Sequence, residues 1–154
     1  MAWAASVQRA KVFVEGAQGT KEFRTGIKAF VRDHLLDHYM RGCDEHQHYC
    51  NIGALVEFGS KSSPTPLRDG ICRYGVAQKV LNLLLKYYWC LAHIPEPLHC
   101  PVDRIIIEQT ALRGKVNWTA IETEAEYRAV IEAVRARAGS ESLARWELRV
   151  YARP

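Results

Sequence analysis

Apolar residues recur every three or four positions along most of this chain, which is the spacing of one face of an α-helix. The first segment with this spacing ends near Gly16 and carries Trp3, Val7, Ala10 and Val14. The second would end at Gly42, which suits a left-handed helix cap, and its apolar stripe holds Phe23, Ile27, Phe30, Val31 and Leu35. The pattern predicts two helices before residue 43.

A third and a fourth helix follow. Asp44 is placed to cap the third, with Gln47 at the capping-box position. Its inner face would hold Tyr49, Ile52 and Val56, while a strand over residues 52–58 is the alternative. Residues 74–92, "YGVAQKVLNLLLKYYWCLA", form the strongest pattern, because this helix is apolar around most of its circumference. We therefore predict that it is the buried centre of the fold.

Capping residues divide the C-terminal third of the chain. Pro101 suits the first position of a helix over "CPVDRIIIEQTAL", and Asp103 suits its positive end. The β-branched run at 104–107 leaves a short strand as the alternative. Thr123 and Glu126 make a capping box for the next helix, which Gly139 would end. A last helix turns three apolar residues inward: Leu143, Trp146 and Val150.

Together these elements predict a mainly α fold. We expect one irregular bundle of about six or seven helices over residues 1–154. A length of 154 residues fits a single domain with a core of its own. The linker-like stretch "GSKSSPTPLRDG", residues 59–70, predicts a flexible loop.

Composition narrows the class of protein. No apolar run approaches the roughly 18 residues of a membrane span, so we expect no membrane partner. The start, "MAWAASVQRAKVFV", has neither the basic nor the sustained apolar region of a signal peptide. Five cysteines, an odd number, then favour reduced thiols and a cytoplasmic protein. A net charge of +4 permits an acidic partner without requiring one, and a homodimer through an exposed apolar patch stays open.

Metal-ligand side chains gather in and before "CDEHQHYC", residues 43–50. With Asp44 as the cap, Cys43, His46 and Cys50 fall on one helix face, and His48 points elsewhere. Two antiparallel helices would then offer four ligands for tetrahedral zinc: His34, His38, His46 and Cys50. The alternative is a solvated turn, because neither a CxxC pair nor an HExxH motif is present. We expect no cofactor, with zinc as the alternative.

The central helix carries its polar residues on one arc of about 100°, and Gly75 lies within it. Such an arc is either the solvated edge of the helix or the floor of a cleft. In a cleft Lys86 would be desolvated, and a nearby acid such as Asp103 would favour its charge. The segment "HCPVD" follows a proline-rich turn that would fold it over the arc. The candidate cleft is therefore lined by Gln78, Lys79, Asn82, Lys86, His99, Cys100 and Asp103.

Basic residues form two stripes. One lies opposite the apolar stripe of the second helix and holds Lys21, Arg24, Lys28 and Arg32; the other, near the C-terminus, holds Arg145, Arg149 and Arg153. Stripes of this kind contact phosphates. Asp33 and Asp37 dilute the first stripe, so a solvated helix face is the alternative.

The C-terminal half carries a resemblance, in the stretches "YGVAQKVLNLLLKYYWCLAHIPEPLHCPVDRIII", "WTAIETEAEY" and "LARWEL". It resembles a group of small uncharacterised bacterial proteins, of the kind met among hypothetical proteins and the mobile gene cassettes of integrons. Its most specific parts are the blocks AQKxLNxxLK and HCPxD, which contain every residue of the candidate cleft. The resemblance implies no activity, and it does not cover the N-terminal third.

Two functions are compatible with these features. The first is a cytoplasmic helical binding module that holds an acidic or nucleic-acid partner through its basic faces or the loop at 59–70. The alternative is a small enzyme or ligand-binding protein that uses the polar cleft. There Lys86 would be the anchor or proton donor, with His99 or Asp103 as general acid or base. Spacing alone assembles no nucleophile with its base, so we favour the module.

Overall fold

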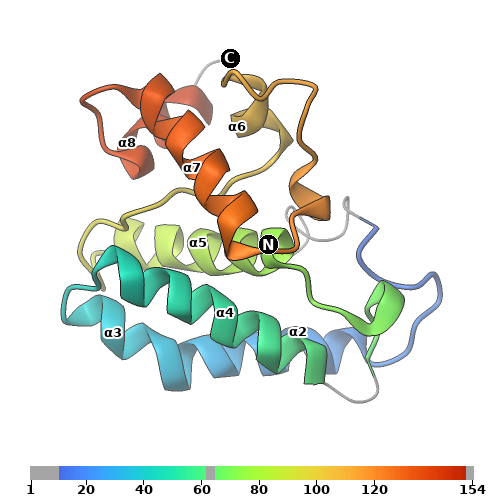
Figure 1. Ribbon diagram of the computed structural model, residues 1–154. Helices are drawn as coiled ribbons and strands as arrows, with labels where there is room; N and C mark the ends of the chain where they lie inside the picture. Colours follow the sequence, from blue (N-terminus) through green and yellow to red (C-terminus); the bar gives the residue numbers. More distant parts are fainter. Residues whose placement is uncertain (1–10, 62–64, 152–154) are drawn as a thin grey trace.

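The computed structural model describes residues 11–61 and 65–151, and these residues form a helical bundle. Figure 1 shows two layers: α2, α3, α4 and α5 lie below, and α6, α7 and α8 lie above. In the described part of the chain no β-strand forms, and the β pairing consists of one isolated bridge between Phe13 and Leu67. The predicted mainly α fold is therefore confirmed.

A long rod forms the lower face. It consists of α2 (Thr20–Phe30), a π-helical segment (Val31–Leu35) and α3 (Leu36–Met40), which continue into one another. Gly42 follows with φ of 91°, the left-handed conformation expected of a residue just past a helix end. The rod turns one apolar stripe to the core, and its buried members are Phe23, Ile27, Val31, Leu35 and Tyr39.

Helix α4 (Glu45–Lys61) returns antiparallel to the rod. Its N-terminus is capped as predicted, because the Gln47 backbone N–H donates to Asp44 Oδ1 at 2.7 Å. The alternative strand at 52–58 is wrong, since these residues lie in the middle of the helix. Residues 59–61 also belong to α4, so the part of the predicted loop that the structure describes starts at residue 65.

Helix α5 (Tyr74–Cys90) is the centre of the fold, as predicted. Every residue from 74 to 82 is buried, and α5 packs against α4, α7 and the 3₁₀ turn Trp118–Ala120. Gly75 permits the last of these contacts, because a Cβ at this position would lie 1.8 Å from the Trp118 carbonyl oxygen. The backbone of the Trp118–Ala120 turn therefore lies directly against α5 at Gly75.

The upper layer begins with the short helix α6 (Arg104–Glu108). Asp103 is its N-cap, and its Oδ1 accepts the backbone N–H groups of Ile105 and Ile106 at 2.9 and 3.2 Å. The prediction of Pro101 at the first helical position is therefore wrong, and so is the alternative strand at 104–107. The side-chain cap starts the helix three residues later.

Helices α7 (Glu124–Ala138) and α8 (Leu143–Tyr151) complete the layer. Thr123 and Glu126 form the predicted capping box, with both reciprocal hydrogen bonds present. Gly139 ends α7 with φ of 66°. On α8, Leu143 and Trp146 are buried as expected.

The helix predicted to end near Gly16 does not reach that residue. Trp3, Val7 and Ala10 lie outside the described residues, and residues 11–19 form turns and a bridge. This segment instead pairs with the stretch before α5: the Val14 N–H donates to the Pro66 carbonyl at 2.9 Å, and the Arg68 N–H donates to the Val12 carbonyl at 2.8 Å. Those intersegment bonds replace the ones a helix would make.

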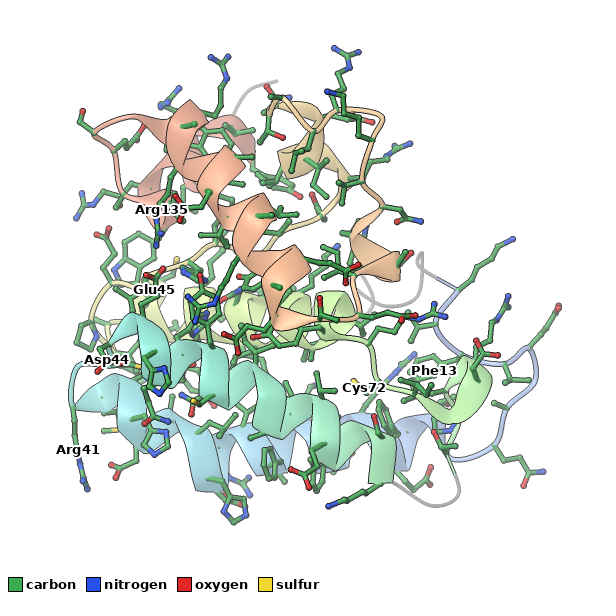
Figure 2. The ribbon with its side chains drawn as sticks, viewed as in Figure 1. Phe13, Arg41, Asp44, Glu45, Cys72 and Arg135 are labelled. Atoms are coloured by element: carbon green, nitrogen blue, oxygen red, sulfur yellow. The ribbon has the colours of Figure 1, made fainter. Side chains whose placement is uncertain are left out.

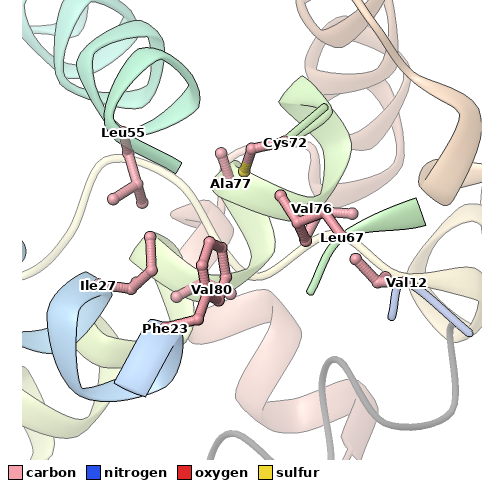
Figure 3. Close-up of a pocket in the computed structure, with 9 residues that line it drawn as sticks. All are labelled: Val12, Phe23, Ile27, Leu55, Leu67, Cys72, Val76, Ala77 and Val80. Carbon is pink, nitrogen blue, oxygen red and sulfur yellow. The ribbon is translucent and has the colours of Figure 1, made fainter. Parts of the chain in front are cut away.

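A small apolar cavity of about 10 Å³ lies in the core below this paired segment (Figure 3). Its lining consists entirely of apolar side chains and one thiol: Val12, Phe23, Ile27, Leu55, Leu67, Cys72, Val76, Ala77 and Val80. A space of this size holds at most about one water, and an apolar lining gives such a water no partner. The cavity is therefore a packing gap. Over the described residues, no helix has both the length and the apolar character to cross a membrane.

Candidate functional site

The polar arc of α5 meets the segment that ends in "HCPVD". Gln78 Nε2 donates to the Val102 carbonyl at 2.7 Å and to the Gly75 carbonyl at 2.9 Å. The Val102 N–H donates back to Gln78 Oε1 at 3.2 Å. One amide side chain thus ties the segment before α6 to the central helix.

The two lysines of the arc have different partners. Lys79 Nζ lies 3.3 Å from Asp103 Oδ2 and 4.5 Å from the centre of the Trp118 ring. Lys86 Nζ donates to both carboxylate oxygens of Glu147 at 2.7 and 2.9 Å. An acid does lie beside Lys86, as expected, but it is Glu147 of α8; Asp103, the example given from the sequence, contacts Lys79 instead.

The arc is therefore an internal polar seam and does not form the floor of an open cleft. Gln78 and Asn82 are fully buried, and the Lys79 side chain is 10% exposed. Cys100 is fully buried too, and burial raises the pKa of its thiol above the usual range. The structure brings the candidate cleft residues together, but it turns their polar groups towards protein partners.

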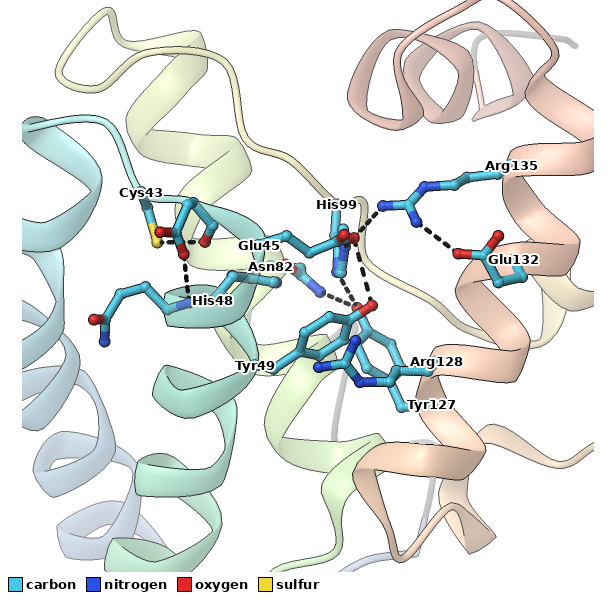
Figure 4. A network of polar contacts seen from close by, with 12 residues as sticks. Cys43, Glu45, His48, Tyr49, Asn82, His99, Tyr127, Arg128, Glu132 and Arg135 are labelled. Carbon is cyan, nitrogen blue, oxygen red and sulfur yellow. Dashed lines mark hydrogen bonds and ion pairs between the residues drawn. The ribbon is translucent and has the colours of Figure 1, made fainter.

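A hydrogen-bonded relay continues from this seam to the surface between α4 and α7 (Figure 4). Asn82 Nδ2 donates to the Tyr127 hydroxyl oxygen at 3.1 Å, and that hydroxyl lies 3.0 Å from His99 Nδ1. His99 Nε2 lies 2.9 Å from Glu45 Oε1, which Arg135 also contacts. Figure 2 shows Arg135 reaching from α7 to Glu45 at the start of α4.

The protonation states of His99 and Glu45 decide which group donates each hydrogen bond of the relay. Burial lowers the pKa of His99 to about 4, although Glu45 opposes this shift. Burial acts to raise the pKa of Glu45, but hydrogen bonds from His99 and Arg135 outweigh it and lower that pKa to about 2. At neutral pH, Nε2–H of a neutral His99 therefore donates to the Glu45 carboxylate, and the Tyr127 hydroxyl donates to Nδ1.

A second buried histidine lies against the first. The rings of His48 and His99 have centroids 4.5 Å apart and meet edge to face. His48 Nδ1 is 2.8 Å from the Tyr39 hydroxyl, whereas its Nε2 has no hydrogen-bond partner among the described residues. Asn82 Oδ1 is a second buried atom without a hydrogen-bond partner among the described residues. The Asn82 amide acts to raise the pKa of His48. Burial dominates, so the pKa of His48 falls well below its usual value.

A carboxylate, an imidazole and a hydroxyl in series form the arrangement that activates a nucleophile in many enzymes. Here the hydroxyl belongs to Tyr127, which is fully buried and already accepts from Asn82. Burial also raises the pKa of Tyr127 well above its usual value. In this conformation the relay joins α4, α5 and α7 and keeps the Tyr127 hydroxyl and the His99 imidazole buried.

Four of these partners, Glu45, Tyr127, Arg135 and Glu147, have no role in the site expected from the sequence. Glu147 lies on α8 between inward-facing Trp146 and the partly buried Leu148. A carboxylate so close to an inward apolar stripe was the available signal of a buried ion pair.

The ligand-rich octapeptide divides between the two sides of α4. His46 Nε2 and Cys50 Sγ lie 3.7 Å apart on the exposed face. His38 Nδ1 instead lies 3.0 Å from Asn51 Oδ1, and the His34 ring packs against Phe30 with centroids 5.0 Å apart. Within residues 11–61 and 65–151, no group of three or more His, Cys, Asp or Glu side chains is arranged to hold a metal ion. The zinc site stays a prediction, which an assay of bound metal tests.

The two basic stripes differ in their ion pairs. On α8, Arg145 pairs with Glu96 at 2.7 Å and Arg149 pairs with Glu141 at 2.8 Å; Arg153 lies outside the described residues. On the rod, Arg32 pairs with Asp33 at 2.6 Å. The other members are Lys21 and Lys28, both exposed, and Arg24, whose guanidinium lies 5.6 Å from the Phe13 ring centre.

Comparison with family models, with curated proteins and with solved structures finds no match to this chain. The residues themselves therefore carry the functional argument. The two blocks that carry the resemblance to integron cassette proteins contact each other, through Gln78 with Val102 and Lys79 with Asp103. Membership of that group stays a prediction.

Proposed function

We propose that this protein is a helical binding module that holds a nucleic-acid partner by its phosphates. The contact surface is the basic end, which we define as Lys11, Lys21, Lys28 and Arg68. The observation that carries the proposal is the contrast in ion pairing: these cations have no carboxylate partner among the ion pairs of the described residues, whereas the arginines of α8 do.

Three segments bring the basic end together. Lys11 and Arg68 lie in the paired segments joined by the bond from the Arg68 N–H to the Val12 carbonyl. They also line a hollow of about 50 Å³ with Arg73 and Thr119. Phe13 connects these segments to α2, because its ring lies 5.9 Å from that of Phe23. The cations therefore share one end of the molecule.

The spacing and balance of charge suit contacts with phosphates and not with bases. Lys21 and Lys28 are seven residues apart on one helix, which places them about 10 Å apart along its axis. Lysine contacts phosphates as a point charge, and such contacts carry no sequence information. Glu15 and Glu22 lie in the same segments and weaken the field, so we expect modest, salt-sensitive affinity.

The experiment is a titration of labelled duplex DNA at rising salt, followed by fluorescence anisotropy. The variant Lys21→Gln/Lys28→Gln removes two exposed charges that make no ion pair with the described residues. Its control, Arg104→Gln/Arg145→Gln, removes two exposed charges that are paired with Glu108 and Glu96. We expect the first variant to reduce the slope of log affinity against log salt by about 2, since each phosphate contact contributes about 0.9.

Two results would contradict the proposal: no binding even at low ionic strength, or equal losses in both double variants. A cytoplasmic location is part of the same proposal and rests on the odd number of cysteines, all five of which are free thiols. The enzyme alternative is less well supported, because Gln78 and Asn82 would have to leave their internal partners before they met a substrate.

A further inference from the structure

A second hollow, of about 140 Å³, lies in the upper layer where α6, α7 and α8 meet. Gln109 follows the last residue of α6, Arg137 lies in the last turn of α7, and the other lining residues are on α8. We call it the arginine hollow, and its lining consists of Gln109, Arg137, Trp146, Arg149 and Val150. In Figure 1 this layer lies on the opposite side of α5 from α2, so the hollow is separate from the basic end.

Among the described residues, the charges that line the arginine hollow are positive only. Arg149 donates through Nε and Nη2 to Glu141 Oε2 at 3.2 and 2.8 Å, which leaves Nη1 without a partner in that pair. Arg137 makes no ion pair or side-chain hydrogen bond with the described residues. In residues 11–61 and 65–151, no carboxylate lines the hollow. Two guanidinium groups that face one space favour an anion between them.

The remaining lining residues set the shape of a site. Trp146 is 3% exposed, so its indole forms a fixed apolar floor, and Val150 continues it. Gln109 adds an amide at the rim. Guanidinium groups present planar forks of N–H donors that match carboxylate and phosphate oxygens. A volume of about 140 Å³ is below the roughly 300–1,000 Å³ of pockets for drug-sized molecules, so it fits a single acidic group.

We propose that the arginine hollow is a binding site for a small oxyanion, a carboxylate or a phosphate group. Arg137 is its principal ligand, because its guanidinium has no competing carboxylate in the part of the chain that the structure describes. Arg149 is the second ligand, held in place by Glu141. This inference goes beyond the proposed binding of nucleic acid. It uses different residues and is tested independently of that proposal.

The test is a titration with inorganic phosphate and, separately, with sodium acetate, at an ionic strength held constant with sodium chloride. The readout is the indole N–H signal of Trp146 in a proton–nitrogen correlation spectrum, assigned with the variant Trp146→Phe. Three variants are compared: Arg137→Gln, the control Arg145→Gln on the exposed face of α8, and Lys21→Gln/Lys28→Gln at the basic end. Thermal unfolding checks that each variant is folded.

We expect a saturable shift of the Trp146 signal in the native protein and in both controls. Arg137→Gln should weaken binding by roughly tenfold or more, the loss that goes with one charge-assisted hydrogen bond. Saturation with phosphate alone identifies a phosphate site, with acetate alone a carboxylate site, and with both a general oxyanion site. A shift that does not saturate with either anion overturns the proposal, and so does equal affinity in Arg137→Gln and Arg145→Gln.

Discussion

Gly75, in the first turn of α5, and Gly53, in the middle of α4, meet different surroundings. A Cβ on Gly75 would lie 1.8 Å from the Trp118 carbonyl oxygen, whereas a Cβ on Gly53 would meet nothing within 4 Å. Gly75→Ala should therefore destabilise the protein by about 1–3 kcal/mol or more, because a backbone segment must move away. The measurement is the free energy of unfolding in urea.

Gly53→Ala is the matched control. It makes the same chemical change in the middle of α4 and should stabilise the protein by up to about 1 kcal/mol, since alanine is the better helix former. If both alanine variants were equally stable, the close contact between α5 and the Trp118–Ala120 turn would not constrain the fold.

Lys86 and Glu147 join two helices that are far apart in the sequence. The Glu147 side chain is 3% exposed and that of Lys86 is 22% exposed, so the pair sits where α8 covers α5. Lys86→Met should destabilise the protein by roughly 2–4 kcal/mol at pH 7, because it leaves the carboxylate buried without its counter-charge. Burial already raises the pKa of Glu147, so acidification would neutralise the carboxyl group and reduce this deficit.

Lys61→Met provides the control at the end of α4. It breaks the Lys61–Glu57 pair, whose side chains are 74% and 66% exposed, and should change stability by no more than about 0.5 kcal/mol. Urea unfolding at pH 7 and pH 5 measures both variants. A Lys86→Met deficit as small as that of Lys61→Met, or one that grows with acidity, would count against a buried pair.

The helices were largely predictable, because their signals are local. The cap at Asp44 and the capping box at Thr123 involve residues only three positions apart. The start of α6 was not predictable in the same way, since Pro101 and Asp103 both fit helix starts and only Asp103 makes the hydrogen bonds. The segment at 11–19 pairs with residues 66–68, a non-local contact that its own apolar spacing does not reveal.

The candidate site, too, was predictable from the sequence only where its signals are local. Its central-helix members share a face, so their spacing on α5 predicted that they would gather. The partners of Asn82, His99 and Lys86 lie 45, 54 and 61 residues away in the sequence. Hydrophobic periodicity places helices in the core but does not specify which helices become neighbours. Partners at such separations therefore follow only from the packed structure.

For the molecule as a whole, the two buried histidines lie where both layers meet. His99 belongs to the segment between α5 and α6, and it contacts Glu45 of α4 and Tyr127 of α7. The positive charges of Arg135 and Arg128 act on it as well, and His48 meets it from α4. A charge placed on either imidazole would therefore disturb the contact between the two layers.

Stability should consequently fall as the pH decreases from about 6.5. Burial lowers the pKa of His99 to about 4 and that of His48 well below its usual value, whereas the unfolded chain takes up these protons near pH 6.5. The stabilisation is fully present above pH 6.5 and is lost as the pH approaches 4. His99 alone accounts for about 3 kcal/mol over this window. Glu45, with its pKa of about 2, extends the loss below pH 4.5.

The variant His99→Gln separates this cause from general acid sensitivity. It should be less stable than the native protein at pH 7, because Gln cannot serve both Tyr127 and Glu45 in the same geometry. Its stability should also change less between pH 6.5 and 4.5, since one proton-binding site is gone. His34→Gln, at an exposed position, should keep the native pH dependence in urea unfolding. A native protein equally stable at pH 7 and pH 5 would show that the histidines are not held neutral where the layers meet.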